Sequence, residues 1–147
     1  MIGAIRPDSW NFPLFLHVLG AFVLVGAVTA GVVAELVSAR SEEGGRLRQI
    51  AFGSFLFGAL PAYVVMRIGA EWLHSKEFGS SSHDPTWVGI GYGIADFGGL
   101  ALLVALILSG VAARRSMGGL GRAAGLLAAI TLAGWLVAVW AMGAKPT

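Results

Sequence analysis

The chain has 147 residues, of which 56% are hydrophobic and only 12% are charged, whereas about 25% of the residues of a typical soluble domain are charged. It contains no cysteine, which excludes disulfides, thiolate nucleophiles, iron–sulfur clusters and zinc sites with sulfur ligands. The formal net charge of +2 comes from basic residues in short connections, so no continuous nucleic-acid surface is indicated. These values favour one integral membrane domain over residues 1–147.

Four apolar stretches follow one another along the chain, over residues 11–37, 47–74, 86–113 and 122–143. A helix needs about 20 apolar residues to cross a bilayer, so each stretch is long enough. None alternates polar and apolar residues as the strands of a membrane barrel do. The sequence therefore predicts an all-α fold, a bundle of four transmembrane helices in the plasma (inner) membrane.

The first stretch has a second interpretation, because the letters VSA at residues 37–39 resemble a signal-peptide cleavage site. However, the apolar run is longer than a signal core, and the charged residues after it are typical of a stop-transfer sequence. We therefore expect the stretch to be retained as the first span.

Arginines are concentrated in the first and third connections, whereas the second has only Lys76 and the termini have Arg6 and Lys145. The six arginines are Arg40, Arg46, Arg48, Arg114, Arg115 and Arg122. Basic connections stay in the cytoplasm, so the first and third are predicted to be cytoplasmic. Both termini and the second connection are then expected on the outer side of the membrane.

The second apolar stretch carries polar residues on one side. Arg67, Glu71 and His74 are spaced four and three residues apart, which places them within about 60° on a helix. Tyr63 lies on the same side one turn deeper. Pro61 precedes this group, and because it lacks a backbone N–H it is expected to disturb the helix there.

The third stretch contributes Asp96, nine residues after Trp87, and Arg67 lies at a similar depth, seven residues before His74. An isolated charge at that depth costs several kcal/mol, so an ion pair between Arg67 and Asp96 is predicted. The face of Asp96 also carries the glycines Gly89, Gly93 and Gly99. Asp96 is therefore expected to point at a closely approaching helix. His17, a few residues into the first stretch, is expected near the same level.

Two other features lie outside this predicted cluster. Glu35 lies at the cytoplasmic end of the first stretch, where pairing with an arginine is expected. Two pairs of glycines four residues apart, Gly89 with Gly93 and Gly121 with Gly125, predict close helix contacts within or between chains.

Residues 16–31, LHVLGAFVLVGAVTAG, resemble the first helix of small membrane proteins related to the copper-resistance-D membrane domain, with a glycine nine residues after a histidine. His17 and Gly26 occupy these positions. More distantly, the chain is similar to the four-helix membrane protoporphyrinogen oxidases, whose corresponding histidine is associated with haem. The resemblance implies His17 as a candidate ligand and Gly26 as a packing position. Leu24 stands where these families commonly have tryptophan.

Three functions follow from these residues. The first is a redox protein with haem b or copper in the outer half of the bundle, where His17 and His74 are candidate ligands and Arg67 binds a propionate or another anion. The second is a proton-coupled transport or binding protein that uses His17, Glu71 and Asp96. The third is a non-catalytic accessory subunit. The expected partners are the lipid bilayer and either a second copy or a partner subunit, and no nucleic acid is expected.

Overall fold

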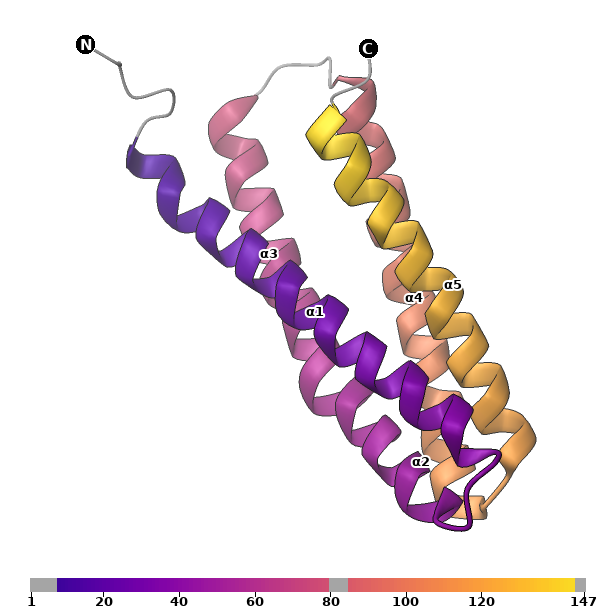
Figure 1. Cartoon of the computed structure of the whole chain (residues 1–147). Helices are drawn as coiled ribbons and strands as arrows, with labels where there is room; N and C mark the ends of the chain where they lie inside the picture. Colours follow the sequence, from indigo (N-terminus) through magenta and orange to yellow (C-terminus); the bar gives the residue numbers. More distant parts are fainter. Residues whose placement is uncertain (1–7, 80–84, 145–147) are drawn as a thin grey trace.

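The computed structural model describes residues 8–79 and 85–144, and within these ranges it consists of helices joined by short turns (Figure 1). Arg6 and Lys145, which enter the orientation argument, lie outside the described residues. In chain order the elements are η1 (Asp8–Trp10), α1 (Asn11–Ser38), α2 (Gly44–Gly53), the π-helical segment η2 (Ser54–Ala59), α3 (Leu60–Glu77), α4 (Thr86–Arg115) and α5 (Gly118–Ala144).

These elements form four rods, each long and apolar enough to cross a membrane. The rods cover Asp8–Ser38, Gly44–Glu77, Thr86–Arg115 and Gly118–Ala144. The predicted bundle of four long apolar helices is therefore confirmed. The second rod is longer than expected, because α2, η2 and α3 follow one another without a break.

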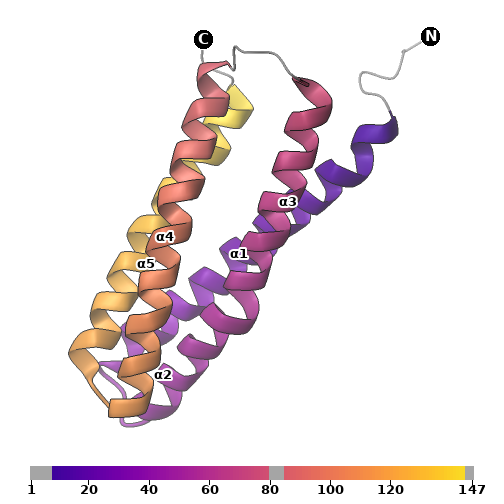
Figure 2. The same ribbon diagram turned by 180° about the vertical axis from the view of Figure 1, so that it is seen from behind.

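Two ends of the bundle differ in shape. The turns at residues 39–43 and 116–117 lie at one end, which we call the basic end. The start of α1 and the end of α5 lie at the other end, which we call the open end. Toward the open end, α1 and α3 lean away from α4 and α5, which stay together (Figures 1 and 2). The main contacts join α1 to α3 and α4 to α5, whereas α3 and α4 make few contacts with each other.

Glycines explain why α1 and α3 cross so closely. A Cβ on Gly20 would lie 2.5 Å from the backbone nitrogen of Met66, and a Cβ on Gly69 would lie 2.5 Å from that of His17. The two backbones therefore touch at positions where no side chain stands between them. Gly26 differs, because among the described residues nothing lies within 4 Å of an added Cβ. The packing role expected for Gly26 is therefore wrong for this structure.

Pro61 acts through the π-helical segment that precedes it. The Leu60 N–H donates to the carbonyl of Phe55, five residues back, where an α-helix would use the carbonyl four residues back. A proline in the first turn of a helical segment needs no N–H partner. Here the preceding segment is π-helical, a conformation that is rare and usually short. Phe55 is fully buried and packs in the space left by Gly31.

Candidate functional site

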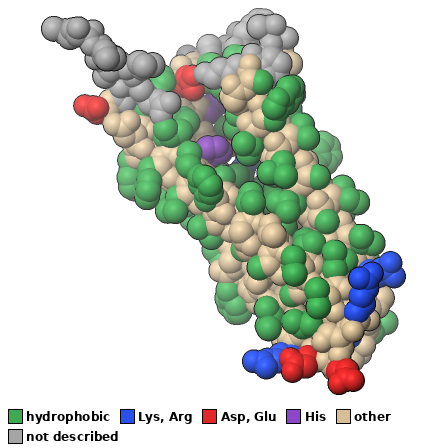
Figure 3. All heavy atoms as spheres, in the orientation of Figure 1, with side chains coloured by type: hydrophobic (Ala, Val, Ile, Leu, Met, Phe, Trp, Pro, Cys, Tyr) green, Lys and Arg blue, Asp and Glu red, His purple; other side chains and the backbone are tan. Residues whose placement is uncertain are grey.

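A cleft lies between the α1/α3 pair and the α4/α5 pair, toward the open end. Its main lobe, about 510 Å³, lies mainly between α1 and α5, and a narrow inner lobe of about 70 Å³ is lined by all four long helices. A third lobe of about 90 Å³ lies near the ends of α3 and α4. Histidine side chains are visible inside the hollow in Figure 3. His17 lines all three lobes, so it is the polar residue common to the whole cleft.

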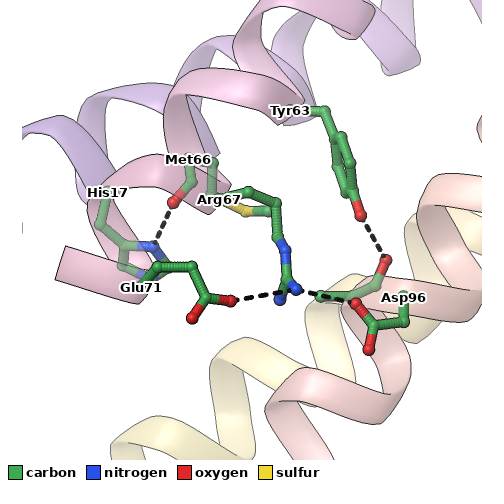
Figure 4. Close-up of polar contacts among 7 residues, drawn as sticks. His17, Tyr63, Met66, Arg67, Glu71 and Asp96 are labelled. Atoms are coloured by element: carbon green, nitrogen blue, oxygen red, sulfur yellow. Dashed lines mark hydrogen bonds and ion pairs between the residues drawn. The ribbon is translucent and has the colours of Figure 1, made fainter. Parts of the chain in front are cut away.

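The ring of His17 is oriented by a hydrogen bond. Its Nδ1 lies 3.1 Å from the backbone carbonyl of Met66, which can only accept, so Nδ1 carries the proton (Figure 4). In the neutral imidazole, Nε2 is then the nitrogen with a free lone pair, which is the arrangement of most metal-binding histidines. The close crossing at Gly69 brings the two partners together.

His74 lines the third lobe together with His17, so the structure brings the two predicted ligands to one cleft. The His74 ring packs against Phe78 and Tyr92, with ring centroids 5.1 and 5.5 Å apart. The backbone of His17 lies beside Gly69, and His74 is five residues further along α3, about 7.5 Å nearer the open end. Within the described ranges, no group of three or more His, Cys, Asp or Glu side chains is placed to hold a metal ion.

The charged residues form a polar seam across α3 and α4, made of Tyr63, Arg67, Glu71 and Asp96 (Figure 4). Arg67 Nη2 lies 2.9 Å from Asp96 Oδ1 and 3.2 Å from Glu71 Oε1. The Tyr63 hydroxyl donates to the carbonyl of Ala95 at 3.1 Å. The predicted ion pair between Arg67 and Asp96 is confirmed, and it joins two helices whose backbones hardly touch.

The expected single cluster is in fact two neighbouring groups. His17 and His74 line the cleft, whereas the side chains of Asp96 and Glu71 are 61% and 54% exposed on the outside of the bundle. Arg67, 22% exposed, lines the inner lobe and also reaches both carboxylates. The two groups are separate because α3 and α4 make few contacts with each other, so the Arg67 guanidinium has to reach from α3 to Asp96.

The environment expected for Asp96 is therefore only partly correct. Gly99 does meet α3, since an added Cβ would collide with Tyr63. In contrast, nothing in the described part of the chain lies within 4 Å of a Cβ added to Gly89 or Gly93. Among the described helices, none packs directly against α4 at Gly89 or Gly93.

Glu35 lies near the basic end and is fully buried. Its Oε1 accepts a hydrogen bond of 2.5 Å from Ser109 Oγ, and among the described residues its Oε2 has no hydrogen-bond partner. The carboxylate fits against Gly121 of α5, where an added Cβ would collide with Oε2, and the Cβ of Glu35 lies against Gly125. The expected ion pair with an arginine is wrong: Arg48 is the nearby cation, and no ion pair to Glu35 forms among the described side chains.

Three cleft or core residues escaped the sequence argument. Tyr92 lines the inner lobe, and its ring lies 4.9 Å from the Arg67 guanidinium carbon; its position one turn before Asp96 was a usable signal. Trp135 of α5 also lines the inner lobe and stacks on Tyr63 at 6.4 Å. Ser109 had no local signal, because only the tertiary structure brings it to Glu35.

The fold and cleft define the class of protein: a helical bundle with four candidate membrane spans and a largely apolar, histidine-containing cleft toward one end. Comparison with protein-family models, with curated proteins and with solved structures finds no match to this chain. The chemistry of the cleft is therefore the basis on which a function can be assigned.

Proposed function

We propose that the protein is a small membrane redox protein that binds haem b in the cleft at its open end, where His17 Nε2 would hold the iron. The observation that carries this proposal is the hydrogen bond of 3.1 Å between His17 Nδ1 and the Met66 carbonyl. It leaves Nε2 as the ligating nitrogen of a ring held in one orientation.

The size and lining of the cleft fit a large apolar cofactor. Small-molecule sites usually enclose about 300–1,000 Å³ and are mostly apolar with a few polar groups, and the main lobe alone measures about 510 Å³. Side chains such as Leu14, Val18, Phe22 and Leu136 line it beside His17. Cofactors of helical bundles are commonly held between facing helices in this way.

The ligand set favours haem over copper. A haem brings its own porphyrin nitrogens and needs one or two ligands from the protein, whereas a copper site is built from several protein side chains. His17 is the ligand that we assign, and His74, about 7.5 Å further along the helix axis, is the candidate for a second ligand. Bound haem would supply one-electron chemistry, and the protein residues would orient it and exclude water.

Arg67 is the candidate partner for a propionate. It lines the inner lobe, but its guanidinium already meets two carboxylates. A propionate would exchange with Glu71, at 3.2 Å, more readily than with Asp96, at 2.9 Å. Arg67 could then keep its contact with α4 while it binds the cofactor.

The test is the absorption spectrum of the protein purified in detergent from cells supplied with a haem precursor. We expect a Soret band and a haem content near one per chain. His17→Ala should abolish the band, and added imidazole should restore part of it by filling the vacated ligand position. His74→Ala is the matched control: it should retain haem, with a changed spin state if His74 is the second ligand. A colourless wild-type protein, or an unchanged spectrum in His17→Ala, would contradict the proposal.

The polar seam supports a second candidate, a non-catalytic accessory subunit in which the charges secure the fold. Arg67 and Asp96 join α3 to α4 where few other contacts do so. If Arg67→Gln combined with Asp96→Asn lowers the thermal stability of the protein, and the purified wild type holds no cofactor, this candidate gains support. Proton-dependent flux that is lost in Asp96→Asn would instead favour proton-coupled transport.

A further inference from the structure

We propose that two copies of the chain pair through one face of α4, which we call the α4 face and define by Gly89, Gly93, Asp96, Phe97 and Leu100. This inference does not depend on haem binding. Figure 2 shows α4 in front, with α3 on one side and α5 on the other. It rests on the charge, the shape and the symmetry of this face.

The first argument is the exposure of charge at membrane depth. Asp96 lies ten residues into α4, about 15 Å along the helix, and the apolar core of a bilayer is about 30 Å thick. Its side chain is 61% exposed and that of Glu71 is 54% exposed, so both carboxylates would face lipid in a single copy. Ionised groups in the hydrocarbon region are costly and are almost always turned toward protein or water. This side of the bundle therefore needs a cover.

The second argument is shape. Gly89 and Gly93 are open, because no described residue lies within 4 Å of an added Cβ, and they line a groove of about 500 Å³ between α4 and α5. Phe97, 79% exposed, projects from the rim of the same groove. Across a two-fold axis, the Phe97 ring of each copy could enter the groove of the other copy, so that the two identical faces fit each other. Open glycines also let two helix backbones approach closely in a membrane.

The charges beside the α4 face favour a second copy of the chain as the partner that covers it. The surface beside the α4 face carries both signs, with Arg67 between Glu71 and Asp96. Both ion pairs use Nη2 of Arg67, so the guanidinium has other donors for a carboxylate of a neighbour. A second copy inserted in the same orientation would place its own Arg67, Glu71 and Asp96 at the same depth, so that Arg67 of each copy could meet a carboxylate of the other. The contact would then cover the carboxylates that a single copy exposes.

The test uses the absence of cysteine in the chain, because a single introduced cysteine is then the only one that can react. Phe97→Cys and Leu100→Cys should form disulfide-linked dimers when membranes that contain the protein at low density are oxidised. Phe22→Cys is the matched control, since Phe22 of α1 is 75% exposed but lies outside the α4 face. We expect it to stay monomeric. Equal cross-linking at Phe97 and Phe22, or none at Phe97 and Leu100, would overturn the proposal.

A second variant tests the same face without a covalent bond. Gly93→Leu adds a side chain where no described residue of the same chain lies within 4 Å of the Cβ, so the single copy should keep its helix content and thermal stability. In liposomes, single-molecule photobleaching should show two copies per particle for the wild type and one for Gly93→Leu. A wild-type protein that is monomeric in liposomes, or a Gly93→Leu variant that remains dimeric, would refute pairing through this face.

Discussion

Two large buried side chains in this protein fit into the core because a glycine on the neighbouring helix leaves room for them. Glu35 is fully enclosed, and the space for its side chain exists because α5 has glycine beside the carboxylate, at position 121, and beside the Cβ, at position 125. A carboxylate at this position keeps one short hydrogen bond, from Ser109, in place of the water that it has lost. The same relation holds for Phe55, which fills the space above Gly31.

The space beside Glu35 leads to a prediction about stability. In Gly121→Ala the new methyl group would collide with Glu35 Oε2, so the free energy of unfolding should fall by about 1–3 kcal/mol, as is typical of overpacked cores. Gly119→Ala is the control, because among the described residues nothing lies within 4 Å of its Cβ. Unfolding in mixed detergent, followed by circular dichroism, measures both variants. Equal stability of the two variants would mean that Glu35 does not lie against Gly121.

At the scale of the helices, the site is created by where α1 crosses α3. Gly20 and Gly69 let the backbones touch, and this contact places the His17 ring beside the Met66 carbonyl. The π-helical segment before Pro61 changes the rotation of α3 relative to α2, so the residues after it take positions that a regular α-helix would not give them. Residue spacing on α3 is still regular, and for this reason Arg67 and Glu71, four residues apart, form an ion pair.

The crossing can be tested by separating the two helices slightly. In Gly20→Ala the Cβ would lie 2.5 Å from the backbone of Met66, which cannot move aside as a flexible side chain does. We expect a loss of about 1–3 kcal/mol in the free energy of unfolding, together with weaker haem binding because the His17–Met66 hydrogen bond is lengthened.

Gly26→Ala, six residues further along α1, is the matched control for this crossing. No described residue lies within 4 Å of its Cβ, so it should change neither the stability nor the haem spectrum. If Gly20→Ala behaves like Gly26→Ala in both measurements, the close contact of α1 with α3 is not needed for the site.

At the scale of the whole molecule, one end of the bundle is closed and the other is open. The basic end is packed around Glu35, Ser109 and the two glycines of α5, whereas the cleft occupies the open end. The Lys and Arg side chains visible in Figure 3 lie at the basic end, and hydrophobic side chains cover the length above them. This distribution supports the proposal that the basic end faces the cytoplasm and that the cleft opens toward the outer side of the membrane.

Cysteine labelling tests this orientation. With a membrane-impermeant maleimide added to intact cells, Gly79→Cys should react, whereas Ser41→Cys and Ser116→Cys should react only after the membrane is opened. The cysteine-free chain gives no background labelling. Gly79 and Ser116 are exposed and Ser41 is partly exposed, so a difference between them reports the side of the membrane. The opposite pattern would place the cleft on the cytoplasmic side.

The sequence by itself determined the features that depend on local pattern. Length and hydropathy predict four apolar helices, because a helix that crosses lipid must satisfy its own backbone. Matching depth in two helices predicted the pairing of Arg67 with Asp96, because a costly charge takes the nearest opposite charge.

Only the tertiary structure decided which surfaces of these helices meet. It separates the histidines from the exposed carboxylates, joins Glu35 to Ser109 and leaves Gly89 and Gly93 open. The physical reason is that a face of small residues allows close contact without specifying its partner. The cleft and the α4 face therefore depend on how the four helices cross. This crossing cannot be predicted from the sequence of each helix taken alone.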